Sequence, residues 1–427
     1  MAMSGVRKNF SYLFGILTVA MYFIGLIIIN RGLGFRNAMI IVSALIAYYI
    51  ANVYNVATNK YKLKDMTTVI VINGILMTVT TFSKIFTFYE GIILFGIITI
   101  FQIAFRYIVI MAVVEKERVV FVGENDYTED LLESVKKDGQ YVFVTSLNNT
   151  DMKALGKEIL ELYNTKKFDV LVDFTDKLLR DPKITEKLLQ YKLEGLQYYN
   201  YLEFYETYEN KLPISHLSPK WFLENTGFEI YHNNFNLKAK RLLDLLFALL
   251  IGIFAAPVIV LAAIIVKLES KGPVFFIQER IGEGNKKFNI VKFRSMTTDA
   301  EKDGPQWASK NDNRVTKFGK IMRATRIDEL PQLWNVLRGE MSFVGPRPER
   351  EFFIQQLEKE IPYYNLRHTV KPGLTGWAQV MYPYGASVED AYRKLQYDLY
   401  YIKHHSIPFD VKVLLKTVTI VIFGKGR

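Results

Sequence analysis

Two adjacent carboxylates, Asp328 and Glu329, stand in the segment TRIDELPQLWNVLRGEMSFVGPRPER, residues 325–350. Adjacent residues on a helix project about 100° apart, so one carboxylate can attack an electrophile while the other holds a metal ion. Pro331 suits the first turn of a following helix, whose N-terminus favours anions. The alternative for such an acidic pair is a solvated helix surface. Five arginines accompany the pair: Arg323, Arg326, Arg338, Arg347 and Arg350.

The nearest arginines bear directly on the chemistry of Asp328. Arg323 and Arg326 precede it by five and two residues, and on a helical stretch Arg323 falls near the same face. Cationic neighbours lower the pKa of a carboxyl group. We therefore expect Asp328 to be ionised and hence available as a nucleophile.

The positive charge of the whole chain is concentrated around this segment. The 427 residues carry a net charge of +11. Residues 1–236 contain 24 basic and 24 acidic side chains, whereas residues 237–427 contain 30 and 19, so the whole excess lies in the second part. A basic domain predicts an anionic partner: nucleic acid, anionic lipid or a phosphorylated substrate. Cysteine is absent, which excludes a disulfide framework and a cysteine-ligated metal.

Four apolar runs open the chain and predict a four-helix transmembrane bundle over residues 1–115. The first and the fourth are long enough to cross a bilayer alone, whereas the second and the third are shorter. Arg106 is the one candidate charge within them, and we expect it to snorkel to the interface. We interpret the bundle as an anchor; the alternative is a functional site among the helices. The runs cover residues 12–29, 38–53, 67–82 and 92–114.

Basic side chains in the short loops set the expected orientation of the bundle, because cytoplasmic loops are rich in Lys and Arg. The bias places both ends of the bundle in the cytosol, although Arg31 and Arg36 lie in a loop on the opposite side. The side chains on the cytosolic side are Arg7, Lys8, Lys60, Lys62, Lys64, Lys116 and Arg118.

We expect residues 116–236 to form a Rossmann-like α/β domain. Strand-like segments at 118–124, 140–147 and 168–175 alternate with helix-like segments at 127–139, 153–167 and 182–195. Such alternation is typical of a parallel sheet. The first turn, VGENDYTED, has only Gly123 and several acids, whereas a dinucleotide site needs more glycines so that backbone can approach a pyrophosphate. We therefore expect a spacer or oligomerisation module, with nucleotide binding as the alternative.

A further segment of 22 residues without charge, 245–266, is long enough to cross a membrane. Pro257 stands in its middle and should kink the helix. Basic residues flank the segment on both sides, which favours a cytosolic location for both ends. We therefore expect a re-entrant helix over about 241–268 that enters and leaves by the same leaflet. The alternative is a fifth span that tolerates the proline.

Further motifs follow: QERIGEGN with Arg280, VKFRSM with Lys292 and Arg294, VGPRPE with Arg347, and KPGLTGWAQV at 371–380. Together with the acidic pair and the kinked apolar segment, they resemble the bacterial sugar transferases. These are polyprenyl-phosphate hexose-1-phosphate transferases, also called monotopic phosphoglycosyl transferases. The resemblance runs from Leu237 to the C-terminus. The helical bundle and the α/β domain, which is similar to CoA-binding domains, match the large form of this family. The family usually has Ser-Pro at the kink, where this chain has Ala256-Pro257.

The resemblance implies a membrane protein of the α plus α/β class, with domains at 1–115, 116–236 and 237–427. It also implies roles for the candidate residues. Asp328 is the nucleophile that attacks the β-phosphorus of a UDP-sugar, and Glu329 binds Mg²⁺. Arg347 holds phosphate from its Pro-Arg-Pro turn. Substrate contacts are also expected from Arg323, Arg326, Lys292, Arg294 and Arg280.

The implied reaction transfers a sugar-1-phosphate from a UDP-sugar to polyprenyl (undecaprenyl) phosphate. UMP leaves, a phosphosugar forms on Asp328, and attack by the polyprenyl phosphate gives a polyprenyl diphosphate sugar. This reaction would start exopolysaccharide, capsule or O-antigen assembly on the cytoplasmic face of the bacterial inner (plasma) membrane. We expect residues 237–427 to be active without the preceding domains.

Three alternatives accompany this interpretation. Arg280 can form a salt bridge to Glu279 instead of binding substrate. A non-catalytic membrane regulator or scaffold of polysaccharide assembly would tolerate the loss of Asp328 or Glu329, yet both are present. A nucleic-acid binder would need a recognised binding module, and it would leave the hairpin at Pro257 without a role. The sugar and a homo-oligomeric assembly are left open.

Overall fold

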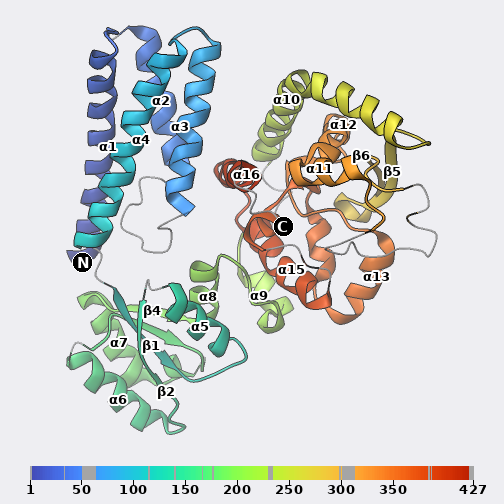
Figure 1. Cartoon of the computed structure of the whole chain (residues 1–427). Coiled ribbons are helices and arrows are strands. Elements are labelled where there is room, and N and C mark those ends of the chain that lie inside the picture. The colour runs from blue at the N-terminus through green and yellow to red at the C-terminus, as the bar shows by residue number, and fades with distance from the viewer. Residues whose placement is uncertain are drawn as a thin grey trace. The chain divides into compact units, whose positions relative to one another are not determined.

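The structure is a computed structural model that describes residues 2–32, 34–50, 64–113, 116–138, 141–165, 167–175, 177–228, 234–297, 300, 313–382, 385 and 387–422. The protein is mostly helical with a mixed α/β region. It divides into two compact units, Met1–Glu209 and Asn210–Arg427, which we call the first and second units (Figure 1). The loop residues Lys60 and Lys62, used above for orientation, lie outside the described residues. The predicted domain boundaries stay predictions.

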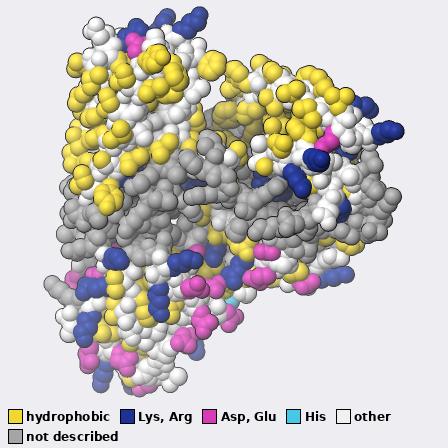
Figure 2. Space-filling model, in the orientation of Figure 1, with side chains coloured by type: hydrophobic (Ala, Val, Ile, Leu, Met, Phe, Trp, Pro, Cys, Tyr) yellow, Lys and Arg dark blue, Asp and Glu magenta, His cyan; other side chains and the backbone are white. Residues whose placement is uncertain are grey.

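The first unit begins with four helices that lie alongside one another (Figure 1). Apolar side chains cover much of their outer surface (Figure 2). Of these four, only α4 contains a described stretch long and apolar enough to cross a membrane, Phe88–Ile108, and the others hold apolar stretches of 10–17 residues. The helices are α1 (Ala2–Ile28), α2 (Phe35–Ile50), α3 (Lys64–Phe82) and α4 (Phe88–Val113).

Buried polar side chains connect all four of these helices. Tyr22 on α1 and Tyr48 on α2 share a hydrogen bond of 3.2 Å between their hydroxyl groups. Tyr48 donates to Asn73 on α3, and Asn73 donates to Gln102 on α4 at 3.1 Å. Polar groups in an apolar environment are costly unless they are paired. Each polar residue therefore constrains the packing of its neighbours.

Arg106 does not behave as the sequence analysis predicts. Only 3% of its surface is exposed, and its guanidinium lies 5.7 Å from the ring centre of Phe14 on α1. The snorkelling prediction is therefore wrong within this unit, because a neighbouring aromatic ring covers the cation. Arg31, one of the two loop arginines that oppose the predicted orientation, forms an ion pair of 2.9 Å with Glu90.

The α/β region follows with a four-stranded parallel sheet in the order β2-β1-β3-β4. The fourth strand extends beyond the three that the sequence analysis predicts. Helices cover both faces of this sheet. Its strands and helices are β1 (Glu117–Val122), α5 (Thr128–Asp138), β2 (Tyr141–Leu147), α6 (Met152–Asn164), β3 (Val170–Asp173), η2 (Leu178–Arg180), α7 (Pro182–Glu194), β4 (Gln197–Asn200) and α8 (Tyr201–Glu209).

Alternation along the central strands builds a hydrophobic core on each face of the sheet. Val119 and Phe121 of β1 pack with residues of α5 and α8. Val120 and Val122 point to the opposite face and pack with residues of α6 and α7. Successive side chains of a strand point to opposite faces, so a strand covered on both sides is apolar throughout. This explains why VVFV reads as a continuous apolar run.

The second unit surrounds a short hairpin, β5–β6, and a parallel pair, β7–β8, with helices. Its elements are η3 (Ile214–His216), α9 (Pro219–Glu224), α10 (Asn234–Glu269), β5 (Phe275–Ile281), η5 (Glu283–Asn285), β6 (Lys287–Phe293), α11 (Lys317–Thr325), η6 (Ile327–Gln332), α12 (Leu333–Arg338), β7 (Ser342–Val344), α13 (Glu351–Glu360), η7 (Tyr364–Thr369), β8 (Gly373–Thr375), α14 (Trp377–Met381), α15 (Val388–Lys403) and α16 (Ile407–Ile422).

Helix α10 contains Pro257 and the longest apolar stretch of the described residues, Asn236–Glu269. Figure 1 shows it as two arms that meet at a bend. Side chains near the bend are exposed, as at Ile253 (70%) and Phe254 (69%), and hydrophobic side chains gather over this helix in Figure 2. Such a surface is unfavourable in water, so the middle of α10 needs an apolar environment.

Residues 210–228, which precede the predicted domain boundary at 237, belong to the second unit and pack against the rest of it. Trp377 Nε1 donates to the carbonyl of Asn210 at 2.9 Å, and Leu212 N donates to the carbonyl of Gln396 at 3.0 Å. Leu212 and Ile214 are completely buried. We call this segment the strap. It has no motif of its own, and its contacts lie more than 100 residues away in the sequence.

The strap predicts a difference between two truncations. A chain that begins at Asn210 retains the strap, whereas one that begins at Leu237 loses it. The burial of Leu212, Ile214 and Leu217 is worth about 5 kcal/mol. We expect the shorter chain to melt about 10 °C or more below the longer one in detergent. Equal melting temperatures would show that the strap does not stabilise the second unit.

Candidate active site

The acidic pair lies on the 3₁₀ helix η6, between α11 and α12. Arg326 ends α11 in a left-handed conformation (φ 58°), which turns the chain so that Asp328 and Glu329 face the hairpin strand β6. Pro331 lies inside η6 and not, as the sequence predicts, in the first turn of the next α-helix, α12. A left-handed non-glycine residue costs conformational energy, and such residues often occur at functional sites.

Three cations surround the carboxylate of Glu329. Arg347 Nη2 donates to Oε1 at 2.9 Å, and Arg326 Nη1 and Lys292 Nζ lie 3.7 and 3.8 Å from the same oxygen. Burial raises the pKa of Glu329, but the charges of Arg347, Lys292 and Arg326 outweigh burial and lower the pKa to about 2. Glu329 is therefore an anion at neutral pH.

Asp328 lies beside this cluster in a different environment. It is buried, and its Oδ1 atom has no hydrogen-bond partner among the described residues. Burial and the charge of Glu329 raise the pKa of Asp328, against the opposing charges of Lys292, Arg347 and Arg323. The cations thus lower the pKa of Asp328 as expected, but burial and the charge of Glu329 outweigh them. An ionised carboxylate without donors keeps its lone pairs available for attack.

Two further predicted residues, Lys292 and Arg323, lie close enough to affect Asp328. Lys292 is on β6, where burial and the charge of Arg347 lower its pKa to about 8 despite Glu329. It therefore carries a proton at neutral pH. Arg323 lies in the last turn of α11 and donates from Nε to Ser295 Oγ at 3.0 Å. Among the described residues, the cluster thus combines the two acids with four cations, Lys292, Arg323, Arg326 and Arg347.

Arg347 reaches Glu329 from the Pro-Arg-Pro turn that follows β7. The turn is held by close backbone approach between β7 and β8. A Cβ atom at Gly345 would collide with the carbonyl oxygen of Lys371, and one at Gly373 would collide with the backbone nitrogen of Gly345. Glycine at these two positions therefore allows the close approach of the two strands.

Arg294 and Arg280 contact the fold rather than Glu329. Arg294 is buried and donates to the carbonyl of Ser270 at 2.8 Å and to that of Lys271 at 3.2 Å, just beyond the end of α10. Arg280 pairs with Glu349 at 3.3 Å, while Lys287 is the partner of Glu279. The roles of these two arginines in substrate binding stay predictions.

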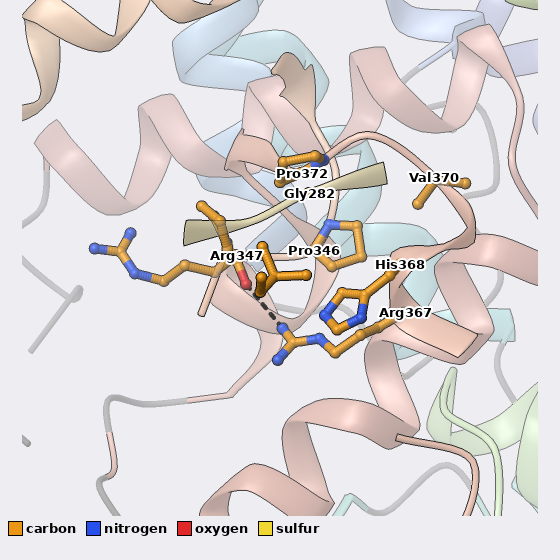
Figure 3. A pocket seen from close by; sticks show the side chains of 9 residues that line it. Gly282, Pro346, Arg347, Arg367, His368, Val370 and Pro372 are labelled. Atoms are coloured by element: carbon orange, nitrogen blue, oxygen red, sulfur yellow. Dashed lines mark hydrogen bonds between the residues drawn. The ribbon is translucent and has the colours of Figure 1, made fainter. Parts of the chain in front are cut away.

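Two residues near Arg347 escaped the sequence analysis. Gln379 Oε1 accepts from Arg347 Nη1 at 3.3 Å, and its buried Nε2 atom has no partner among the described residues. Arg367 donates to the backbone carbonyl of Arg347 at 3.0 Å. Figure 3 shows both groups of Arg347: its carbonyl faces Arg367 and His368, and its guanidinium points away from them. The signal available for Gln379 was its place beside the glycines of KPGLTGWAQ.

A divalent cation is compatible with the acidic pair. Mg²⁺ is held in proteins by one or two carboxylates and by phosphate oxygens of a substrate. The shortest contact of each cation around Glu329 is to Oε1, and Oδ1 of Asp328 has no hydrogen-bond partner in the part of the chain that the structure describes. Both acids therefore have an oxygen to offer. Among the described residues, no three His, Asp or Glu side chains group together as a protein-only metal site.

The first unit has little free space beside Gly123, close to where a parallel sheet usually binds nucleotides. Ligands of such folds bind at the carboxyl ends of two neighbouring strands from which the chain continues to opposite sides of the sheet, and these strands are β1 and β3 here. Thr175 packs so tightly against Gly123 that a Cβ atom there would collide with its methyl group. The Thr175 side chain thus occupies the space directly beside Gly123.

Comparisons with known proteins match the second unit to one family. The family model described as bacterial sugar transferase matches residues 235–424. The UDP-N-acetylgalactosamine-undecaprenyl-phosphate N-acetylgalactosaminephosphotransferase of Aeromonas hydrophila is 42% identical over 55% of this chain and 54% of its own length. The UDP-glucose:undecaprenyl-phosphate glucose-1-phosphate transferase of Klebsiella pneumoniae is 45% identical over 44% of this chain and 40% of its own length.

The chain thus spans about half or less of the length of those two relatives. Coverage is larger for the UDP-glucose:undecaprenyl-phosphate glucose-1-phosphate transferase of Caulobacter vibrioides, which is 45% identical over 42% of this chain and 68% of its own length. The matched region contains the acidic pair, the Pro-Arg-Pro turn and all of α10 except its first residue. With its motifs, its site and these matches, the chain belongs to the bacterial sugar transferase family.

Proposed function

We propose that this protein transfers a sugar-1-phosphate from a UDP-sugar to a polyprenyl phosphate and releases UMP, through a covalent phosphosugar on Asp328. This reaction would start the assembly of a bacterial surface polysaccharide. The observation that carries the proposal is the contrast between the two acids. Asp328 is buried and its Oδ1 atom has no hydrogen-bond partner among the described residues, whereas Oε1 of the adjacent Glu329 is contacted by three cations. The related transferases named above act on UDP-sugars and undecaprenyl phosphate by their names.

In the first step, Asp328 attacks the β-phosphorus of the UDP-sugar. A bond forms between a carboxylate oxygen and this phosphorus, and the bond to the oxygen that bridges the α- and β-phosphorus breaks. UMP leaves with the bridging oxygen. In this proposal Lys292, Arg323 and Arg347, whose charges act on Asp328, balance the negative charge of the diphosphate. Desolvation of Asp328 favours attack because no water shell has to be removed.

In the second step, an oxygen of the polyprenyl phosphate attacks the same phosphorus. The bond to Asp328 breaks, the carboxylate is regenerated, and the product is a polyprenyl diphosphate sugar. Glu329, together with phosphate oxygens, would hold Mg²⁺, which supplies positive charge at the diphosphate. Arg347 fixes the orientation of Glu329 through its 2.9 Å contact and so keeps the two acids in different roles.

The contacts of α10 support a re-entrant arrangement in the membrane. In the first arm, Lys240 pairs with Asp410 at 2.5 Å, and Asp244 accepts from Phe343 N at 3.0 Å. In the second arm, Glu269 accepts from Phe318 N at 2.8 Å. Both arms therefore bind the same compact unit. A single unit cannot lie on both sides of a bilayer, so a helix that enters the membrane at its bend must leave on the side of entry.

The bend makes this arrangement geometrically reasonable. A straight helix of 36 residues would be about 54 Å long, which exceeds the hydrocarbon core of a bilayer. Pro257 lies inside α10 and lacks the N–H group of one backbone hydrogen bond, which favours a bend in the helix. We propose that α1–α4 form a transmembrane bundle and that the second unit lies on the cytoplasmic face of the plasma membrane, where UDP-sugars are made.

We expect Asp328→Asn to lower the rate of UMP release by ~10⁴–10⁶, as the loss of a covalent nucleophile usually does. The assay supplies undecaprenyl phosphate and a panel of UDP-sugars, including glucose, galactose and their N-acetylated forms. Glu329→Gln should lower the rate and weaken its dependence on Mg²⁺. Glu358→Gln, at an exposed position of α13, is the matched control and should leave the rate unchanged. Near-normal UMP release by Asp328→Asn would contradict the proposed nucleophile.

The same two substitutions should change stability in opposite directions at pH 7. The pKa of Glu329 falls from 4.5 to about 2 on folding, which stabilises the folded unit above pH 4.5 and is lost as the pH falls towards 2. Glu329→Gln should therefore cost about 3 kcal/mol at pH 7 and much less near pH 2. Folding raises the pKa of Asp328, so its charge destabilises the unit, and Asp328→Asn should melt above the wild type.

Thermal melting in detergent at several pH values checks this pair of predictions. A loss of about 3 kcal/mol corresponds to about 6–12 °C for a unit of this size. A Glu329→Gln variant that melts with the wild type at pH 7, or an Asp328→Asn variant that melts below it, would show that the charges of the site are balanced differently.

Cysteine labelling tests the topology, because the chain has no cysteine. Lys240 is unsuitable since it is paired with Asp410, so we choose the exposed Lys238 and Lys271 at the two ends of α10. Both cysteine variants should react with an impermeant thiol reagent only in opened cells. Lys84→Cys, between α3 and α4, should react in intact cells. Labelling of either end of α10 from outside would rule out the re-entrant arrangement.

A further inference from the structure

The backbone of the Pro-Arg-Pro turn is held by donors from outside the turn. Four successive carbonyl groups, from Pro346 to Glu349, each accept a hydrogen bond. The donors are Gly373 N at 3.0 Å, Arg367 Nη2 at 3.0 Å, Arg280 Nη1 at 3.2 Å and Ile281 N at 3.0 Å, in that order. Both prolines of the turn lack an N–H group, so these carbonyl contacts are a main source of its backbone restraint.

The donor to Arg347 itself is a buried guanidinium. Arg367 is 7% exposed, and its Nη2 atom also pairs with Asp398 on α15 at 2.9 Å. Asp398 is 2% exposed. Arg367 Nη1 donates to the hydroxyl of Tyr364 at 2.5 Å. One guanidinium therefore connects α15, the 3₁₀ helix η7 and the carbonyl of Arg347 (Figure 3).

Stability alone does not account for this pair. A buried ion pair has a large desolvation cost, and a well-packed apolar pair of similar volume often gives equal stability. The Nε atom of Arg367 is buried and has no hydrogen-bond partner among the described residues, which adds to that cost. What an apolar pair cannot supply is a donor to the carbonyl of Arg347.

We infer that Arg367, held by Asp398, is a positioning residue that fixes Arg347 against Glu329. The inference rests on the proposed function, in which Arg347 and Glu329 serve the transfer of a sugar-1-phosphate. Arg367 acts on the backbone of Arg347, on the side opposite to the guanidinium that reaches Glu329 at 2.9 Å. A displacement of about 1 Å in a positioned group can cost about 10²-fold in rate.

The test replaces both members of the pair in the full-length protein. Arg367→Met combined with Asp398→Leu removes the donor and the charge but keeps an apolar filling. We expect a melting temperature within a few degrees of the wild type and a kcat for UMP release about 10²-fold lower. The control changes another ion pair on α15, the helix of Asp398, by Glu389→Gln with Arg393→Gln. It should change neither the melting temperature nor kcat.

The same double substitution in an Arg347→Ala variant distinguishes a positioning role of Arg367 from a general structural effect. On the Arg347→Ala background, the double substitution should lower kcat by less than about 3-fold, because the group that it positions is already gone. If the double substitution lowered kcat by the same factor on the Arg347→Ala background as in the wild type, the inference would be wrong. Should the apolar pair fail to fold, Arg367→Lys, which replaces the guanidinium fork by a single nitrogen, enters the same cycle.

Hydrogen exchange gives a readout that does not depend on activity. The amides of Gly373 and Ile281 donate to the turn, so loss of Arg367 should speed their exchange about 10-fold or more while α11 stays protected. Unchanged exchange at both amides would also overturn the inference. If the wild type releases no UMP from any donor, the proposed function fails, and the exchange result alone decides whether Arg367 restrains the turn.

Discussion

The half-buried ion pair between Glu329 and Arg347 is the contact that joins the two segments of the candidate site. Its atoms lie 2.9 Å apart, and each group would be costly to bury alone. Glu329 comes from a short 3₁₀ helix and Arg347 from a turn after β7, so neither segment has enough regular structure to fix its own side chain. The close approach of β7 to β8 and the carbonyl contacts of the turn provide that restraint.

This pair also explains how neighbouring acids acquire different properties. Cations approach Glu329 from three segments, which keeps it ionised and fixed. Asp328 gains burial without a hydrogen-bond partner for Oδ1 among the described residues. A metal-binding acid needs a stable charge, whereas a nucleophile needs an accessible lone pair. In the proposed reaction these two roles fall to Glu329 and Asp328, and the cost in stability falls on Asp328, whose pKa is raised in the folded unit.

Much of this site could be predicted from sequence, because local motifs carry it. The structure brings Asp328, Glu329 and Arg347 together with Lys292, although their catalytic roles stay predictions. The parallel sheet followed from strand–helix alternation, and the family followed from the order of motifs. Such features depend on short-range patterns, which a single sequence displays directly.

The remaining features depend on contacts between distant segments. Arg294 stands in a motif next to Lys292, yet it binds carbonyl groups at the end of α10. Arg367 and the strap at 210–228 have no distinctive pattern, and only the folded chain shows that they touch Arg347 and Trp377. Arg106 is covered by a ring from another helix. No local rule predicts a partner that the fold supplies.

The contacts of α10 constrain the order of events during synthesis. Lys240 pairs with Asp410, which lies 170 residues later in the chain. At about 5–20 residues per second, that partner leaves the ribosome several seconds or more after Lys240. Until then, Lys240 in the first arm lacks its partner Asp410, and the exposed apolar side chains near the bend are already present. In the proposed re-entrant arrangement, the hairpin therefore stays at the membrane surface in an undocked state, and its final depth is set only when the last helices of the unit have folded.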